Sequence, residues 1–471
     1  MKFYSIISSK SLLLAFFVFG SFALSAQVSS LSPYSRFAIG TLVQEGTATQ
    51  IGMGGVASSL ANFSGINYQN PASYAFMLKS GMHVGGKGEF LTLSTTSQTE
   101  KISLTSINHV GLNFKRQGGK TGFALGLAPF STSGYSITDT QQSEDIGDIT
   151  YSYDGSGGVN RAYLGFGRIF ILNTPKGFLD KTFAPDSLES ANMISVGANL
   201  NYYFGSLQQT RRVVYEDASY LHTRISAKTS VSDVDFNFGV LGQFNLKNTY
   251  NSSRERIKKT DLFVGVTYSL GNDLNTKFNE LTETITFVSD FELVVDTIAD
   301  FDASQGSISI PQKITAGFGL RHQTRKGRTM EFQFDYKTQD WSQFSSEDSP
   351  IIETAVLAKA QSFHVGFEFT PLSPSKAPNF IQSINYRLGL RYSDTYLKIN
   401  SNQITETAIS AGLTIPLRKS QSASRIIFGT EFGQKGTTDG SLIHEQFVNV
   451  YVGLSLSPHL FNNWFVKRQY D

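Results

Sequence analysis

Cysteine is absent from this 471-residue chain, and long apolar runs are scarce. Without cysteine the protein has no disulfide, no thiolate metal site and no N-terminal cysteine to carry a lipid anchor. Beyond the N-terminal region, no apolar run approaches the length of about 18 to 20 residues that a membrane-spanning helix needs. A strong charge of one sign is also missing, because 40 basic residues face 38 acidic ones. The composition therefore gives no electrostatic reason to expect nucleic acid as a partner.

The first 26 residues have the layout of a secretory signal peptide. Lys2 and Lys10 precede or flank an apolar core at residues 12–19, and small residues follow up to Ala26. The core is too short to span a bilayer, and small residues mark the cleavage site of signal peptidase. We predict that residues 1–26 are removed, with a retained membrane anchor as the alternative. Removing the two lysines from the 40 basic residues leaves 38 against 38 acidic ones, so the mature chain is formally neutral.

Aromatic residues and glycine are abundant instead, with 38 Phe, 20 Tyr and 42 Gly. They occur in segments where apolar residues alternate with polar or small ones, as in residues 194–204, ISVGANLNYYF. Successive side chains of a strand point to opposite faces, so such a segment forms a strand with one apolar face. The pattern recurs from Gly81 towards the C-terminus. It predicts about 14 antiparallel strands, within the even-numbered range of single-chain membrane barrels.

Charged residues lie on the polar face of several predicted strands. In a barrel these side chains point into the lumen, where water or one another can satisfy them, while the apolar face meets lipid. A soluble multi-domain sandwich is the alternative, but it predicts domains of about 100 residues joined by linkers, and the chain shows no such division. We therefore predict an all-β protein, with a transmembrane antiparallel β-barrel over residues 81–471. The charged positions expected to face its lumen are Arg321, Asp335, His364, Glu368, Arg387, Arg391 and Glu431.

Residues 27–80 differ from the rest of the chain, because alternation is weak and glycine and small residues dominate 40–59. Asn70 and Pro71 are favoured at the N-cap and the first position of a helix, so a short helix is predicted to start there. Residues 52–57 fit the loose dinucleotide pattern G-x-G-x-x-A, but no buried strand precedes them, as such a site requires. We expect these glycines to let the backbone pass close to the barrel wall.

The connections between predicted strands differ in length, as in outer-membrane barrels with short periplasmic turns and long external loops. Residues 117–120 are predicted to form a tight hairpin, and the basic run 245–260 a solvated loop or strand end. An amphipathic strand at 451–456 is expected to close the barrel, and the aromatic residues after it to lie at the membrane interface. The segments predicted to form outward loops are 131–160, 206–227 and 271–280.

No motif in the chain identifies a catalytic or metal site. The seven histidines show no H-E-x-x-H pattern, and G-x-S-x-G is absent. Residues 119–121 resemble the tail of a P-loop, but Phe114 stands where its first glycine belongs, so a hairpin turn is predicted. The acidic residues between 290 and 302 lack the spacing of an EF-hand loop. We expect no catalytic residue, no metal and no cofactor.

Two motifs in the N-terminal region resemble the signature of the FadL/TodX family of outer-membrane transporters. Residues 50–57 contain Gly52, Gly54 and Gly55 in the form G-x-G-G, and residues 65–73 contain an Asn-Pro-Ala turn. Residues 336–344 and 409–417 resemble strand segments of the same family. The resemblance implies a 14-stranded barrel whose N-terminal segment, residues 27–80, folds into the lumen as a plug. It also implies that Asn70, Pro71 and Ala72 position or gate that plug.

The same resemblance implies an outer-membrane channel in a Gram-negative bacterium, surrounded by outer-membrane lipids. A hydrophobic small molecule such as a long-chain fatty acid would enter through the plugged barrel by facilitated diffusion. One alternative is a scaffold or shuttle subunit of a protein secretion system, whose partner is a protein. Uptake predicts a continuous internal tunnel, whereas a scaffold predicts a filled lumen and a partner surface. The other alternative is an enzyme, which requires Ser or Asp within hydrogen-bond reach of His109 or His364.

Overall fold

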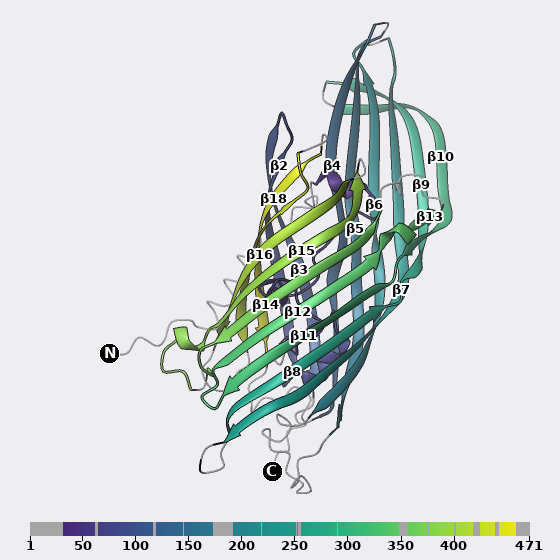
Figure 1. Cartoon of the computed structure of the whole chain (residues 1–471). Helices are drawn as coiled ribbons and strands as arrows, with labels where there is room; N and C mark the ends of the chain where they lie inside the picture. Colours follow the sequence, from purple (N-terminus) through teal and green to yellow (C-terminus); the bar gives the residue numbers. More distant parts are fainter. Residues whose placement is uncertain are drawn as a thin grey trace, which may run out of the picture.

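One antiparallel sheet closes on itself into a barrel in the computed structural model of the chain (Figure 1). The predicted signal peptide and the aromatic residues after the last strand lie outside the described residues, as do residues 117 and 118 of the hairpin turn predicted at 117–120. The structure describes residues 32–61, 65–115, 119–144, 146–172, 192–217, 219–250, 252, 256–289, 291–347, 357–374, 376–399, 402–417, 424–438 and 442–457.

Fourteen strands of the described chain form the ring, as the alternation predicts. Each strand pairs with its neighbour in the chain, except that β8 pairs with β11 and β12 with β14, and β18 pairs with β2 to close the ring. The strands of the ring are β2 (Gly81–Ser94), β3 (Thr99–Lys115), β4 (Thr121–Ser143), β5 (Gly147–Ile171), β6 (Met193–Tyr215), β7 (His222–Tyr250), β8 (Arg256–Ser269), β11 (Lys313–Thr324), β12 (Thr329–Asp340), β14 (Lys359–Thr370), β15 (Asn385–Ile399), β16 (Asn402–Pro416), β17 (Arg425–Lys435) and β18 (His444–Leu456).

One side of the barrel rises far above the other (Figure 1). β5 has 25 residues and β7 has 29, whereas β17 on the opposite side has 11. Residues 237–250 of β7 pair with β8 in the ring, and residues 222–231 pair with β9 (Asn272–Val288) above it. β9 forms a hairpin with β10 (Phe291–Ile310), which in turn pairs with the short strand β13 (Ser345–Glu347). We call this end of the barrel the tall end.

The strand faces follow the alternation in the sequence. In β6 the side chains of Val196 and Leu200 are about two-fifths exposed, at 39% and 41%, whereas Ser195 and Asn199, one position before each, are buried at 0% and 1%. The exposed side chains are apolar and the buried ones polar, which inverts the arrangement of a soluble core. Only a surrounding apolar solvent makes this inversion favourable, because lipid satisfies no polar groups and accepts apolar ones. The ring is therefore a transmembrane barrel.

The charged residues predicted to face the lumen do so, and four of them form two ion pairs with one another. Arg387 binds Glu368 at 2.6 Å and Arg391 binds Glu431 at 2.7 Å, with both arginines buried. Arg321 pairs with Glu331, its neighbour on β12, at 2.7 Å. Pairing compensates the cost of removing these charges from water, which is several kcal/mol for an isolated ion. The lumen thus carries ionic pairs where the outer wall carries aliphatic side chains.

The three predicted outward loops are wrong in detail, because each is made largely of strand. Residues 131–160 form the upper parts of β4 and β5, and 206–227 form those of β6 and β7. Residues 271–280 lie almost wholly in β9. Above the membrane both faces of a strand meet water or protein, so the alternation that marks a half-buried strand fades there. Backbone pairing continues without it. Within the basic run at 245–260, residues 245–250 end β7 and residues 256–260 begin β8, in agreement with the strand-end interpretation.

No helix in the described part of the chain is long and apolar enough to cross a membrane.

Candidate functional site

The N-terminal segment, described at residues 32–61 and 65–77, lies inside the ring. It contains the 3-10 helices η1 (Pro33–Arg36) and η2 (Pro71–Phe76), the strand β1 (Thr41–Leu42) and the short helix α2 (Ala48–Ile51). β1 pairs with β4, and every described residue from 48 to 77 is buried. The segment contacts inward-facing side chains on several sides of the ring. Because this segment occupies the lumen, any function of the barrel has to be compatible with it.

Asp335 of β12 holds the segment from one wall. Its carboxylate accepts hydrogen bonds from the backbone N–H groups of Ala57 at 2.6 Å and Ser58 at 2.8 Å, and from the Ser58 hydroxyl at 2.5 Å. Asp335 and Ser58 are both fully buried. Hydrogen bonds to an ionised acceptor are about twice as strong as neutral ones. One inward carboxylate on the ring therefore fixes the middle of the segment.

Glu45 joins the segment to two other strands through an ionic trio. Its carboxylate lies 3.1 Å from the Arg161 guanidinium on β5 and 2.5 Å from the Lys313 ammonium on β11. Burial alone raises the pKa of a carboxyl group, but Lys313 and Arg161 outweigh that effect and hold the pKa of Glu45 well below its usual range. Glu45 therefore stays ionised throughout the neutral pH range, and its ionic contacts with Arg161 and Lys313 are maintained there.

The predicted glycines lie where the segment touches the wall. An added Cβ at Gly52 would lie 2.9 Å from the Cα of Gly412 on β16. Gly54 has φ of +71°, and an added Cβ there would lie 2.6 Å from the Val365 carbonyl oxygen and 2.7 Å from that of Leu390. Gly55 has φ of +83°. This is the close backbone approach that the glycine-rich motif predicts, and it leaves no room for a side chain.

Replacing Gly54 by alanine is expected to loosen the segment. The left-handed conformation costs about 1–3 kcal/mol for a residue with a Cβ, and the clash with the β14 and β15 backbones adds to it. We expect faster cleavage of the segment by protease in detergent, with the barrel itself intact. Gly88→Ala is the matched control, because its nearest neighbours would lie 3.9 Å from the new Cβ. Equal cleavage of both variants would contradict the close-approach argument.

The order of elements around the glycines excludes the dinucleotide pattern. α2 ends at Ile51, before Gly52, and residues 52–55 form turns. A dinucleotide site needs a strand before the glycines and a helix after them, whose N-terminus receives the phosphates. Here a helix precedes the glycines and no helix begins in the described residues that follow them until Pro71.

Asn70, Pro71 and Ala72 start a helix, as predicted, although it is of the 3-10 type. The Asn70 Oδ1 atom accepts from the Ala72 N–H at 3.0 Å, and Pro71 occupies the first helical position. The Asn70 amide donates to the Ser58 carbonyl at 2.5 Å, and the Ser195 hydroxyl of β6 donates to the Ala72 carbonyl at 2.7 Å. The motif thus caps η2 and ties it both to Ser58, three positions after Gly55, and to the wall.

His364 and Ser362 of β14 form the contact that an enzyme would require, with 2.9 Å between Nε2 and Oγ. The Nδ1 atom of His364 lies 2.6 Å from the Gly54 carbonyl oxygen, so Nδ1 donates and Nε2 accepts from Ser362. His364 is only 1% exposed. The N-terminal segment therefore shields the imidazole of His364 from any substrate. The contact between Ser362 and His364 instead acts as another link between the segment and the wall. His109 binds the Tyr163 hydroxyl at 2.7 Å.

An apolar cluster fills the lumen towards the tall end. Tyr34, Phe37 and Ile39 of the N-terminal segment pack among side chains that reach in from the wall, and all three are buried. The Trp341 ring, after β12, lies 5.0 Å from that of Tyr396 on β15. The wall side chains of the cluster include Val159, Tyr203, Leu207, Val231, Leu274, Ile308, Trp341, Tyr396 and Ile404. Side chains of the chain itself thus occupy the apolar part of the lumen.

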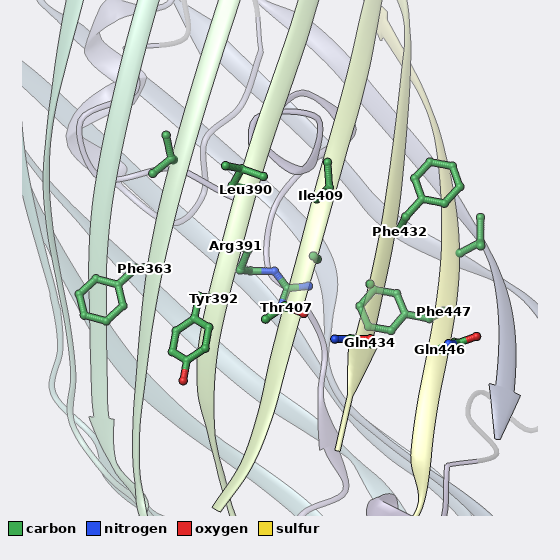
Figure 2. Close-up of a pocket in the computed structure, with 14 residues that line it drawn as sticks. Phe363, Leu390, Arg391, Tyr392, Thr407, Ile409, Phe432, Gln434, Gln446 and Phe447 are labelled. Atoms are coloured by element: carbon green, nitrogen blue, oxygen red, sulfur yellow. The ribbon is translucent and has the colours of Figure 1, made fainter. Parts of the chain in front are cut away.

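Two cavities contrast in size and position. One, of about 20 Å³, lies between α2 and strands β2, β3 and β18 and has room for about one water molecule. The other, of about 660 Å³, is a groove on the wall of β14 to β18, where Leu390, Ile409 and Phe432 are about half exposed. In Figure 2 these three residues lie towards one end of the groove, while Tyr392, Gln434 and Gln446 lie towards the other. The larger space therefore opens on the apolar outer surface, although the buried side chains of Arg391 and Phe447 also line it.

The groups that hold the segment and were not predicted as site residues include Glu45, Ser58 and Lys337. The Lys337 ammonium donates to the Gly55 carbonyl at 2.9 Å and to the Gln69 side chain at 3.0 Å. Lys337 lies two positions after Asp335 on the same face of β12, so the alternation that placed Asp335 in the lumen could have identified it. Glu45 and Ser58 lie outside any strand and gave no such signal. Among the described residues, no three His, Asp or Glu side chains gather as metal ligands.

Solved structures with this architecture include two toluene transporters. The structure of the Pseudomonas putida toluene transporter TodX aligns with a TM-score of 0.51 and 14% identity, over 88% of this chain and 98% of that one. The Ralstonia pickettii toluene transporter TbuX aligns with a TM-score of 0.51 and 11% identity, over 88% and 99%. At such identity the likeness shows a common fold, which is the FadL/TodX-like fold that the sequence motifs predict. No curated protein matches the chain.

A family model settles the relationship more closely. The model described as BamG matches residues 8–175 and 171–471, which together span nearly the whole chain. The match includes the N-terminal segment as well as the ring. With its FadL/TodX-like barrel and its filled lumen, this chain belongs to the BamG family.

Proposed function

We propose that this protein is a sealed outer-membrane barrel that serves as a scaffold subunit for a protein partner, in a secretion or assembly system. The observation that carries the proposal is the filled lumen. Tyr34, Phe37 and Ile39 occupy its apolar part, and every described residue from 48 to 77 is buried within it. A barrel built for passage needs free volume along its axis. A barrel built to hold a partner needs a rigid wall and an exposed surface.

The contacts between segment and wall favour a fixed position for the segment. Asp335, Lys337 and His364 each bind backbone groups of the segment, from β12 and β14. Glu45 reaches β5 through an ion pair with the buried Arg161 and β11 through a partly exposed ion pair with Lys313. Breaking a buried pair typically costs about 3–5 kcal/mol. We infer that residues 27–80 act as a permanent plug, and that Asn70, Pro71 and Ala72 position it.

Uptake of hydrophobic compounds, such as long-chain fatty acids, is the second candidate. The fold shared with two toluene transporters favours it. In this case the segment would have to move, with the glycines at 52, 54 and 55 as its hinge and the Asn-Pro-Ala turn as its gate. Neither candidate requires a nucleophile, a metal or a cofactor, and we propose that the protein is not an enzyme. The export-type N-terminus and the barrel support the outer membrane of a Gram-negative bacterium as its location.

Mass spectrometry of the gently purified protein separates the two candidates. The scaffold proposal expects another protein in a fixed ratio and no hydrophobic molecule beyond the lipids that any barrel retains. Proteoliposomes provide the functional readout, because a scaffold leaves the entry rate of a fluorescent fatty acid and of toluene at the protein-free value. One hydrophobic molecule bound per chain, together with accelerated entry, would overturn the scaffold and establish uptake.

A further inference from the structure

β10 exposes an unusual number of apolar side chains on the hairpin that rises at the tall end. The exposed fractions run from 49% for Leu293 to 75% for Phe291. Isolated apolar residues on a surface are ordinary, but a concentration of exposed apolar side chains within one short stretch of a strand indicates an interaction site. The six residues of this group, which we call the β10 patch, are Phe291, Leu293, Val294, Val295, Ile298 and Phe301.

Lipid does not account for the β10 patch. The hairpin is outside the ring, because β8 and β11 pair with each other beneath it. Asp296, Asp300 and Asp302 are interspersed with the patch and exposed, and a carboxylate in hydrocarbon is costly. Beside the patch, Arg224 binds both Glu283 and Glu292 at 2.7 Å. Such a density of charge places the hairpin in water, where the patch is left uncovered by the described chain.

The charge on β10 restricts what can cover the patch. The strand contains Glu292, Asp296, Asp300 and Asp302 and no lysine, arginine or histidine. Glu292 is neutralised by Arg212 and Arg224 at 2.7 Å each, which leaves three acidic side chains facing outwards. An anionic lipid headgroup would be repelled by them. A protein surface that carries basic side chains among apolar ones would be attracted, since complementary charge steers association.

The backbone of β10 indicates how such a partner docks. Its pairing with β9 is interrupted by register shifts between Val294 and Asp296, between Thr297 and Ala299, and between Phe301 and Ser304. Irregular, charged edges of this kind discourage the addition of a further strand. The partner is therefore expected to contact side chains of the β10 patch and not to extend the sheet.

We propose that the β10 patch is the docking surface for a protein partner whose contact surface combines Lys or Arg with apolar residues. The proposal deepens the scaffold function and rests on it. It assigns the partner to the tall end, on the hairpin between β9 and β10, and it assigns the acidic residues the role of selecting a basic partner over lipid.

Photo-crosslinking in cells of the native host tests the proposal on the full chain. A benzophenone amino acid replaces Ile298, and in a control it replaces Ile381, which is similarly exposed at the other end of the barrel. We expect an adduct with a different protein at position 298 only, with a cross-linked peptide that contains Lys or Arg. Converting Asp296, Asp300 and Asp302 to Lys should lower the adduct yield on the order of tenfold.

Every other outcome overturns the docking proposal. An adduct made only of this chain identifies a second copy, and an adduct with lipid alone identifies the membrane surface. The absence of an adduct, or an adduct whose yield is unchanged by the charge reversal, contradicts the proposal of a basic protein partner. The proteoliposome assay reports separately on the scaffold function. A sealed barrel without the adduct therefore refutes the docking surface alone, whereas accelerated entry of hydrophobic compounds refutes the scaffold itself.

Discussion

Planar bilayers that contain the protein without residues 27–80 are expected to conduct ions freely, whereas bilayers with the full mature chain stay closed. A ring of fourteen strands is intermediate between small barrels filled by their own side chains and 16- to 18-stranded porins with an aqueous channel. In this barrel the N-terminal segment supplies the filling. Its removal should leave the lumen lined by Arg387, Arg391 and Glu431, which water can solvate. We expect the single-channel conductance to rise on the order of tenfold or more.

A second variant keeps the test decisive if the chain without residues 27–80 does not fold. Residues 48–61 are replaced by a Gly/Ser linker of equal length, so that the chain keeps its N-terminal contacts at η1 and β1 while losing α2 and the glycine-rich turn. The ring strands carry their own backbone pairing from Gly81 onwards. Heat-modifiable migration on a gel shows that the barrel has closed. If both variants fold and remain as tightly closed as the full chain, the segment is not the plug.

Asp335→Ala is expected to destabilise the protein by about 3–5 kcal/mol, the typical cost of breaking a buried charged contact. The substitution leaves the N–H groups of Ala57 and Ser58 buried without their acceptor, and each unsatisfied donor costs about 1–3 kcal/mol. The segment should detach more readily as a result. We expect brief conducting events in bilayers and a lower urea midpoint for unfolding in detergent.

The control for Asp335→Ala is Asp296→Ala. Asp296 is an exposed carboxylate on β10, far from the lumen, and such surface changes stay within about 0.5 kcal/mol. Asp335→Asn is a further comparison, because it keeps the shape and loses the charge. A loss below about 1 kcal/mol for Asp335→Ala, with no conducting events, would mean that the segment is held mainly by other contacts.

The sequence predicted the ring well because, in each strand, neighbouring side chains alternate between those suited to lipid and those suited to the lumen. Alternation in 194–204 separates Val196 and Leu200 from Ser195 and Asn199, and the structure places these pairs on opposite faces. The inward charges followed from the same rule. The rule fails where both faces of a strand meet water or protein, and for that reason the upper parts of β4 to β7 and the strand β9 were predicted as loops.

The glycine-rich motif and the Asn-Pro-Ala turn pointed to the right part of the chain. Their wall partners did not follow from the sequence. Ala57 and Asp335 are separated by 278 positions, and no periodic pattern links them. Ser58 is an ordinary serine until the fold brings it to a buried carboxylate. The exposed patch on β10 was also not predicted, since its apolar residues look like any strand that faces lipid.

By itself, the sequence determined the fold class, the approximate number of strands and which face of each strand is apolar, because these depend on side chains one or two positions apart. Only the tertiary structure decided that β7 changes partner from β8 to β9, which wall residues hold the N-terminal segment, and that β10 stands in water. These features depend on contacts between residues far apart in the chain. Such contacts form only when the ring closes and brings its walls around the segment.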